Sequence, residues 1–109
     1  MKEKVNTVVK MLEKAVVHDI IVYDMQNITP FYDYCIICSA NSSRQGSAAV
    51  NYVRKDAHEA GLDVRGYHSG SETKWHLVDL GGIVVHVFVG DEREKYNLDG
   101  MYGMQNMLV

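Results

Sequence analysis

The chain has 109 residues and a mass of 12.3 kDa, with 47% hydrophobic residues, 23% charged residues and a formal net charge of −3. A folded chain of this mass exposes roughly 6,100 Å² against roughly 17,800 Å² when unfolded, so residues 1–109 can form a single domain with one core. The composition excludes disordered, collagen-like and low-complexity proteins. The fourteen acids against eleven lysines and arginines argue against nucleic acid as the main ligand.

The chain carries two cysteines, Cys35 and Cys38, which are too few for a disulfide framework. Its first residues lack the apolar run of a signal peptide, and no stretch approaches the roughly 18 apolar residues of a membrane span. We therefore expect a cytoplasmic protein with reduced thiols and no membrane contact.

The first part of the chain predicts one helix followed by two strands. Hydrophobic residues recur at helical spacing and predict an amphipathic helix from about Lys2 to Val17. The β-branched residues 20–23 predict a short strand, and residues 33–40 predict a second, well-buried strand. Pro30 lies in the loop between them, because proline is excluded from central strands.

A second helix is predicted to start near Ser42. Ser42 followed by Gln45 forms a capping box, which satisfies free N–H groups in the first turn, and Gly61 is a natural stop at the other end. Gly46, in the first turn, is less favourable there than alanine by ~1 kcal/mol, and the sequence offers no reason for it. The residues predicted to face inward are Ala49, Val50, Val53, Ala57 and Ala60.

The stretch from Trp75 to Val89 predicts a β-hairpin. Two apolar runs flank Gly81 and Gly82, which supply the positive φ angles of a two-residue turn. This turn fixes the register of the whole hairpin. It pairs Leu80 with Ile83, Asp79 with Val84, Val78 with Val85, Leu77 with His86, His76 with Val87 and Trp75 with Phe88.

Side chains alternate between the two faces of a strand, so the hairpin has two different faces. The first face is hydrophobic apart from His76, and we expect the two helices to cover it. The second face mixes aromatic and aliphatic side chains with a carboxylate and an imidazole, which is typical of a binding surface. It consists of Trp75, Leu77, Asp79, Val84, His86 and Phe88.

Shorter elements complete the chain. Residues 63–67 predict a short strand and residues 68–74 a polar loop. After the hairpin, acids that precede Arg93 and Lys95 favour a short helix or turn, and a methionine-rich tail occupies residues 100–109. The order of the elements predicts an α+β fold, in which a mixed five-stranded sheet carries helices mainly on one face.

Two patterns could carry chemistry, and each has a simpler interpretation. Cys35 and Cys38 have the C-x-x-C spacing of a zinc or redox site, but residues three apart on a strand point to opposite faces, so we expect two small buried residues. Asp79 and His86 share a face and could act as a general base with its orienting carboxylate. We favour a structural pair that shapes an interface, and we predict no catalytic residue, no metal ligand and no cofactor.

Six motifs lie between Asp19 and Leu98, within a stretch of similarity to a known family that runs from about Val5 to Tyr102. They are Asp19-Ile20-x-Val22-x-Asp24, Asp33-Tyr34-x-x-Ile37, Ser39-x-Asn41-Ser42-x-Arg44-Gln45, Trp75-x-Leu77-x-Asp79-x-Gly81, Val84-Val85-His86-x-Phe88 and Arg93-x-x-Tyr96-x-Leu98. In order and spacing they resemble the ribosomal silencing factor family, also called Iojap-like proteins.

The resemblance implies a nucleotidyltransferase-like fold without that enzyme's catalytic residues. It implies binding to the large ribosomal subunit through large-subunit ribosomal protein fourteen, a steric block of small-subunit joining and repression of translation, with a further role in maturation of the large subunit. It also implies a homodimer, no DNA partner and at most peripheral contact with ribosomal RNA. The partner-binding residues are then those of the second hairpin face, extended by Arg93, Tyr96 and Leu98.

Two other functions stay open at this point. One is a nucleotide-binding or hydrolytic enzyme relic that uses Asp24, Asp79 and His86, although the phosphate loop or the paired metal-binding carboxylates that it needs are missing. The other is direct binding of ribosomal RNA, which predicts a clustered basic face.

Overall fold

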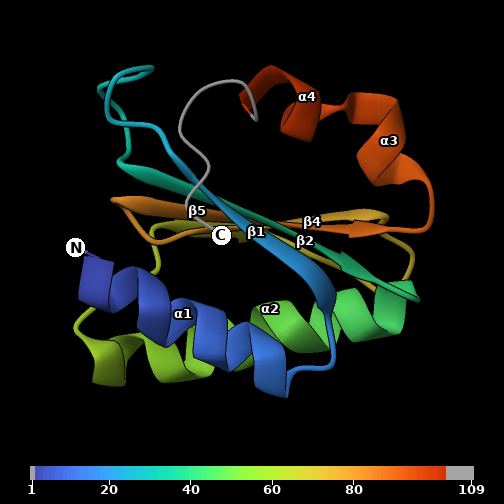
Figure 1. Ribbon diagram of the computed structural model, residues 1–109. Helices are drawn as coiled ribbons and strands as arrows, with labels where there is room; N and C mark the ends of the chain where they lie inside the picture. Colours follow the sequence, from blue (N-terminus) through green and yellow to red (C-terminus); the bar gives the residue numbers. More distant parts are fainter. Residues whose placement is uncertain (1, 103–109) are drawn as a thin grey trace.

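The computed structural model describes residues 2–102, in which two long helices cover one face of a five-stranded sheet and two short helices lie on the other (Figure 1). The helices are α1 (Lys2–Lys14), α2 (Ser43–Ala57), α3 (Glu92–Tyr96) and α4 (Leu98–Tyr102), with a 3₁₀ turn at His58–Ala60. The strands are β1 (His18–Asp24), β2 (Tyr34–Ala40), β3 (Gly66–His68), β4 (Trp75–Asp79) and β5 (Ile83–Val89). The predicted α+β class is confirmed.

The strands lie in the order β1-β2-β5-β4-β3, with β2 and β5 parallel and the other neighbours antiparallel. The hairpin register predicted from its turn is confirmed along β4 and β5, from Trp75 opposite Phe88 to Asp79 opposite Val84. Leu80 N–H donates to the Ile83 carbonyl at 2.8 Å, and Gly81 has a φ of 87°. Only Gly81 takes the positive φ predicted for both glycines, and Gly82 does not, so the turn needs a glycine at its first position because a positive φ is costly for other residues.

The core lies between the sheet and the two long helices, as predicted, and His76 is buried inside it. Its Nδ1 lies 2.9 Å from Ser69 Oγ, and its ring lies directly against Gly46 at the start of α2. A Cβ at position 46 would overlap the imidazole, so the glycine that the sequence left unexplained makes room for His76.

The helix caps match the sequence prediction. Ser42 Oγ accepts from the N–H of Gln45 at 3.2 Å, and the Gln45 side chain accepts from the N–H of Asn41 at 3.0 Å. At the other end Gly61 adopts the left-handed conformation that closes the 3₁₀ turn. These contacts fix where α2 begins and where the chain leaves it.

Several element boundaries differ from the prediction, and the first strand, for example, runs over His18–Asp24 instead of residues 20–23. The first helix ends at Lys14 instead of Val17, because Val16 takes a positive φ of 63° and turns the chain toward β1, which leaves its side chain 68% exposed. The short strand predicted at residues 63–67 is displaced to Gly66–His68. Arg65 nevertheless donates its N–H to the Asp79 carbonyl at 2.7 Å, so the approach to β3 already follows β4.

A second, smaller cluster lies on the opposite face of the sheet, under α3 and α4. Its buried members are Tyr23, Met25, Cys35, Ile37 and Phe88, with Ile21, Tyr32, Trp75 and Leu98 packed against them. Cys35 therefore belongs to this cluster and Cys38 to the main core, as strand alternation predicts. Burial raises the pKa of both thiols to about 12, so they stay protonated at neutral pH.

Candidate functional site

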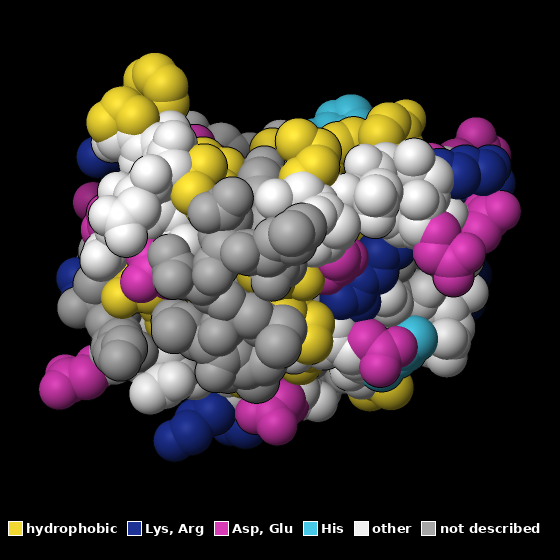
Figure 2. Space-filling view, turned by 45° about the horizontal axis from the view of Figure 1, so that its top comes forward, with side chains coloured by type: hydrophobic (Ala, Val, Ile, Leu, Met, Phe, Trp, Pro, Cys, Tyr) yellow, Lys and Arg dark blue, Asp and Glu magenta, His cyan; other side chains and the backbone are white. Residues whose placement is uncertain are grey.

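The candidate site is the part of the second sheet face that the short helices leave open, over β4 and β3. We call this open part of the sheet, together with Tyr96 of α3 at its border, the docking surface, and define it by His68, Trp75, Leu77 and Tyr96. His68, Trp75 and Leu77 line a shallow, mostly apolar hollow of about 280 Å³. Figure 2 shows this side of the molecule, where hydrophobic side chains gather along the upper edge beside a histidine.

Trp75 lies at the centre of an aromatic group. Its ring centroid lies 4.4 Å from that of Tyr96 and 5.0 Å from that of Phe88. Tyr96 is 51% exposed, whereas Phe88 is fully buried beneath the indole. The half-buried tryptophan is thus held from below and from one side, which leaves part of its surface free for a partner.

His86 holds the indole from the adjacent strand. The Nε1–H of Trp75 donates to His86 Nδ1 at 3.0 Å, and only 8% of His86 is exposed. Burial lowers the pKa of His86 to about 4, so the ring is neutral at pH 7 and its Nδ1 is free to accept. His86 therefore orients Trp75 instead of presenting a charge to solvent.

Asp79 does not pair with His86. Its Oδ1 accepts the N–H of Gly81 at 2.9 Å, which stabilises the hairpin turn two residues further on. The predicted Asp79–His86 pair is wrong, because each side chain is held by a different neighbour on its own hairpin. Asp79 stays half-exposed at the end of the docking surface nearest the turn.

Arg93 points into the molecule and joins four segments. Its Nε and Nη2 donate to the two carboxylate oxygens of Asp99 at 2.8 and 3.1 Å. Its Nη1 donates at 2.8 Å to the Asp19 carbonyl and to Ser39 Oγ. The side chain is 15% exposed. Arg93 therefore ties α3 and α4 to β1 and β2, whereas the sequence had predicted that it would extend the binding surface.

Asp99 completes this network and was missed by sequence reasoning. Tyr23 donates its hydroxyl to Asp99 at 2.5 Å from the buried side. Burial alone would raise the pKa of Asp99, but the hydrogen bonds from Arg93 and Tyr23 hold it below the usual value. Burial, together with the Asp99 bond, raises the pKa of Tyr23. The only sequence signal for this role was an acid six residues after Arg93.

The nine predicted partner-binding residues fall into two groups. Those that retain exposed surface are Trp75, Leu77, Asp79, Tyr96 and Leu98. Those that are largely buried are Val84, His86 and Phe88 on the sheet, and Arg93 in its network with Asp99, Asp19 and Ser39. The sequence placed His68 in a polar loop, but it lies on β3, where it pairs with Leu77 of β4 and lines the hollow. The exposed part is thus smaller than predicted, and it extends toward β3.

The three residues of the alternative enzyme do not meet. Asp24 lies at the end of β1, and its Oδ1 accepts the N–H of Gln26. Asp79 lies on β4, and two strands separate it from β1, a distance of roughly 14 Å at the usual strand spacing. Within residues 2–102 no group of three or more His, Cys, Asp or Glu side chains could hold a metal ion. None of the described helices is long and apolar enough to cross a membrane.

Comparison with known proteins identifies a family whose sequence matches this chain. The sequence model of a family described as "Ribosomal silencing factor during starvation" matches residues 1–108. The chain is 42% identical over 85 residues to the ribosomal silencing factor of Bacillus subtilis, a match that spans 78% of this chain and 72% of the relative. It is 31% identical over 102 residues to that of Halalkalibacterium halodurans, covering 94% of this chain and 87% of the relative.

The fold has a solved counterpart as well. A crystal structure of a protein from Chromobacterium violaceum superposes with a TM-score of 0.86 at 33% identity, and the match covers 94% of this chain and 85% of the other. The shared architecture therefore extends over nearly the whole chain, including the strands that carry the docking surface.

Proposed function

Because the chain belongs to the ribosomal silencing factor family, we propose that it binds the large ribosomal subunit through large-subunit ribosomal protein fourteen. The bound domain occupies space that the small subunit needs, so joining of the subunits is blocked and translation is repressed. The proposal places the protein in the cytoplasm and includes a role in maturation of the large subunit. It assigns no catalytic step and no cofactor.

The observation that supports the proposal best is the anchored, half-exposed Trp75. Interfaces are dominated by a few aromatic or arginine side chains that are rigid before binding and become desolvated on binding. Trp75 is held by His86, Phe88 and Tyr96, and the apolar hollow beside it offers room for a partner side chain. A surface of this kind fits a protein partner.

The charge of the chain is compatible with the same partner. A net charge of −3 favours approach to a basic ribosomal protein, and such steering weakens as salt screens it. Half-exposed Asp79 supplies a carboxylate at the end of the docking surface for a cation of the partner. We therefore expect the association rate with large subunits to fall as ionic strength rises.

Sedimentation with isolated large subunits tests the proposal. The protein should comigrate with large subunits and inhibit their joining to small subunits. Trp75→Ala should weaken this binding by ~2 kcal/mol or more, which is about thirtyfold. Phe31→Ala is the matched control, because it removes another aromatic side chain, 84% exposed, from the loop between β1 and β2. Unchanged binding by folded Trp75→Ala protein would refute the proposed surface.

The homodimer and the enzyme alternative need separate tests. Sedimentation velocity over a range of protein concentrations measures whether two copies associate, and we propose that they do. Titration with ATP and Mg²⁺ measures nucleotide binding and turnover. Saturable turnover would contradict the absence of a catalytic step.

A further inference from the structure

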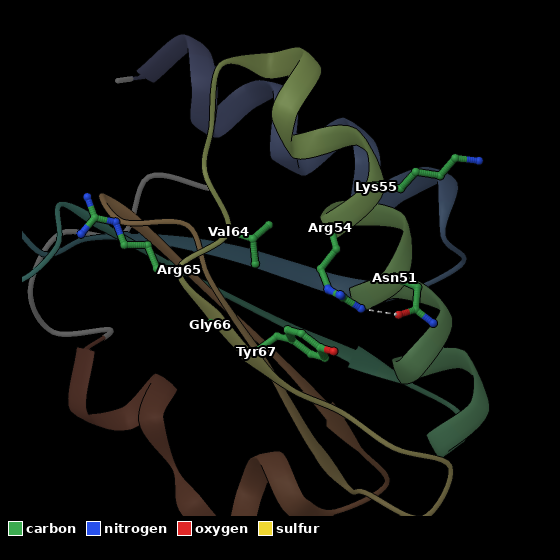
Figure 3. Close-up of a pocket in the computed structure, with 7 residues that line it drawn as sticks. All are labelled: Asn51, Arg54, Lys55, Val64, Arg65, Gly66 and Tyr67. Atoms are coloured by element: carbon green, nitrogen blue, oxygen red, sulfur yellow. Dashed lines mark hydrogen bonds between the residues drawn. The ribbon is translucent and has the colours of Figure 1, made fainter.

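A second surface lies across the sheet edge from the docking surface. It is an open groove of about 600 Å³ between α2 and β3, lined by Asn51, Arg54, Lys55, Val64, Arg65, Gly66 and Tyr67 (Figure 3). We call it the basic groove. We propose that the basic groove binds the phosphate backbone of an RNA strand.

The charges around the basic groove differ from those of the whole chain. Among the described residues, three lysines and arginines line it and no aspartate or glutamate does, although acids outnumber cations in the sequence. The nearby acids Asp56 and Glu59 line the neighbouring groove toward α1. The two sides of α2 thus differ in charge, and the side toward β3 is positive.

Arg54 is held ready to bind. Its guanidinium lies over the ring of Tyr67, 3.6 Å from the ring centroid, and its Nη1 donates to Asn51 Oδ1 at 3.3 Å. An arginine held on an aromatic ring keeps N–H groups at its edge free for a phosphate, and it loses less side-chain entropy on binding. Tyr67, 51% exposed, therefore positions Arg54 at the groove.

The three cations do not converge on one point. In Figure 3 Arg54 extends from α2 toward Tyr67, whereas Lys55 and Arg65 point outward on opposite sides of the groove. A single small anion would contact one of them at a time. A strand with a phosphate at every nucleotide can contact all three, so the spacing favours an extended polyanion.

The place of the groove favours RNA as that polyanion. On β3, Tyr67 lies opposite Val78 of the core side, and His68 lies opposite Leu77 of the docking surface. One short edge strand therefore separates the basic groove from the docking surface. This part of the inference rests on the proposed function, since a protein that contacts a ribosomal protein there brings the groove close to ribosomal RNA.

Fluorescence anisotropy with a labelled oligouridylate of about 20 nucleotides tests the inference without ribosomes. The double variant Arg54→Gln/Arg65→Gln should bind at least about fivefold more weakly at low salt. The slope of log affinity against log salt should become shallower by about 0.7 for each phosphate that the variant no longer neutralises. The matched control Lys10→Gln/Lys14→Gln removes the same charge from the groove between α1 and α2. It should leave affinity and slope nearly unchanged.

Three outcomes would overturn the inference. They are no binding of the oligomer by the unmodified protein at low salt, equally weakened binding in the two double variants, and equally tight binding of a polyaspartate of matched charge. Sedimentation with large subunits separates this inference from the proposed function. If the unmodified protein binds RNA through Arg54 and Arg65 but ignores large subunits, the groove is supported and the proposed function is refuted. If the unmodified protein sediments with large subunits but does not bind the RNA oligomer, the proposed function is supported and the RNA-binding groove is refuted.

Discussion

The indole N–H of Trp75 donates a 3.0 Å hydrogen bond to Nδ1 of His86, its neighbour across the hairpin. Nδ1 accepts only while the imidazole is neutral, with its proton on Nε2. The burial that keeps His86 neutral thus also keeps the central anchor of the docking surface in place. Trp75 is the single tryptophan of the chain, so its fluorescence reports directly on this contact.

Replacing His86 should loosen Trp75 without removing it. His86→Phe keeps an aromatic ring beneath the surface but removes the acceptor, and a hydrogen bond of this kind is worth about 0.5–1.5 kcal/mol. We expect two- to tenfold weaker binding to large subunits and a changed tryptophan emission spectrum. His58→Phe is the control, because His58 is exposed beyond the end of α2. Identical emission in His86→Phe and the unmodified protein would contradict the role of this bond.

Stability should fall in mild acid. Burial lowers the pKa of His76, and it lowers that of His86 to about 4, so the unfolded chain binds more protons than the folded one below an ordinary histidine pKa of about 6.5. The free energy of unfolding is therefore highest above about pH 6.5 and decreases as the pH falls toward 4, by on the order of 3 kcal/mol for His86 alone.

Urea unfolding at several pH values between 7.5 and 4.5 measures this decrease. The His86→Phe variant should show a shallower decrease over the same range, because it lacks one of the two buried imidazoles. A free energy of unfolding that stays constant over this range would show that the two rings are protonated as easily in the folded protein as in the unfolded chain.

Gly46→Ala should destabilise the protein even though alanine favours helices. The change gains about 1 kcal/mol of helix propensity, but the new Cβ would overlap the buried His76 ring, and overpacking costs typically about 1–3 kcal/mol. His76 cannot easily move aside, because it is fully buried and bonded to Ser69. We therefore expect a net destabilisation of about 1 kcal/mol in urea unfolding.

Ser47→Ala provides the control for this prediction. It also introduces alanine, which raises the helix propensity, at the next position of α2, where the side chain is only half-buried. Stabilisation by both alanines would mean that the helix propensity outweighs the contact with His76.

Arg93→Lys should destabilise the packing of α3 and α4 on the sheet. Lysine cannot reproduce the two parallel bonds to Asp99 together with those to Asp19 and Ser39. Hydrogen bonds to charged groups contribute about 1.5–3 kcal/mol each, and we expect a destabilisation in that range in urea unfolding. The pKa of Asp99, measured by NMR, should rise toward its ordinary value.

Lys95→Gln serves as the comparison. Its ammonium lies 3.7 Å from Asp91 and is 60% exposed, and such surface pairs contribute about 0–1 kcal/mol. If Lys95→Gln destabilises the protein as much as Arg93→Lys does, the number of positive charges in this region, and not the hydrogen-bond geometry of the arginine, stabilises it.

The sequence by itself determined the features that depend on near neighbours. Alternation along residues 75–89 and two glycines in the turn specified the hairpin register and its two faces, because each side chain follows from its position on the strand. The cap at Ser42 and the stop at Gly61 likewise depend on contacts a few residues away. The opposite facing of Cys35 and Cys38 followed from the same period of two.

Tertiary structure decided which side chains of the second face stay exposed. Phe88 is buried in the cluster under α3 and α4, and His86 is buried beside the Trp75 indole. Arg93 turns inward because Asp99, Asp19 and Ser39 surround it. Asp19 and Ser39 lie 74 and 54 residues away from Arg93 in the sequence, so no local pattern could reveal these two contacts. The reason for Gly46 was hidden in the same way, because the His76 ring that excludes a side chain there comes from a strand 30 residues further along.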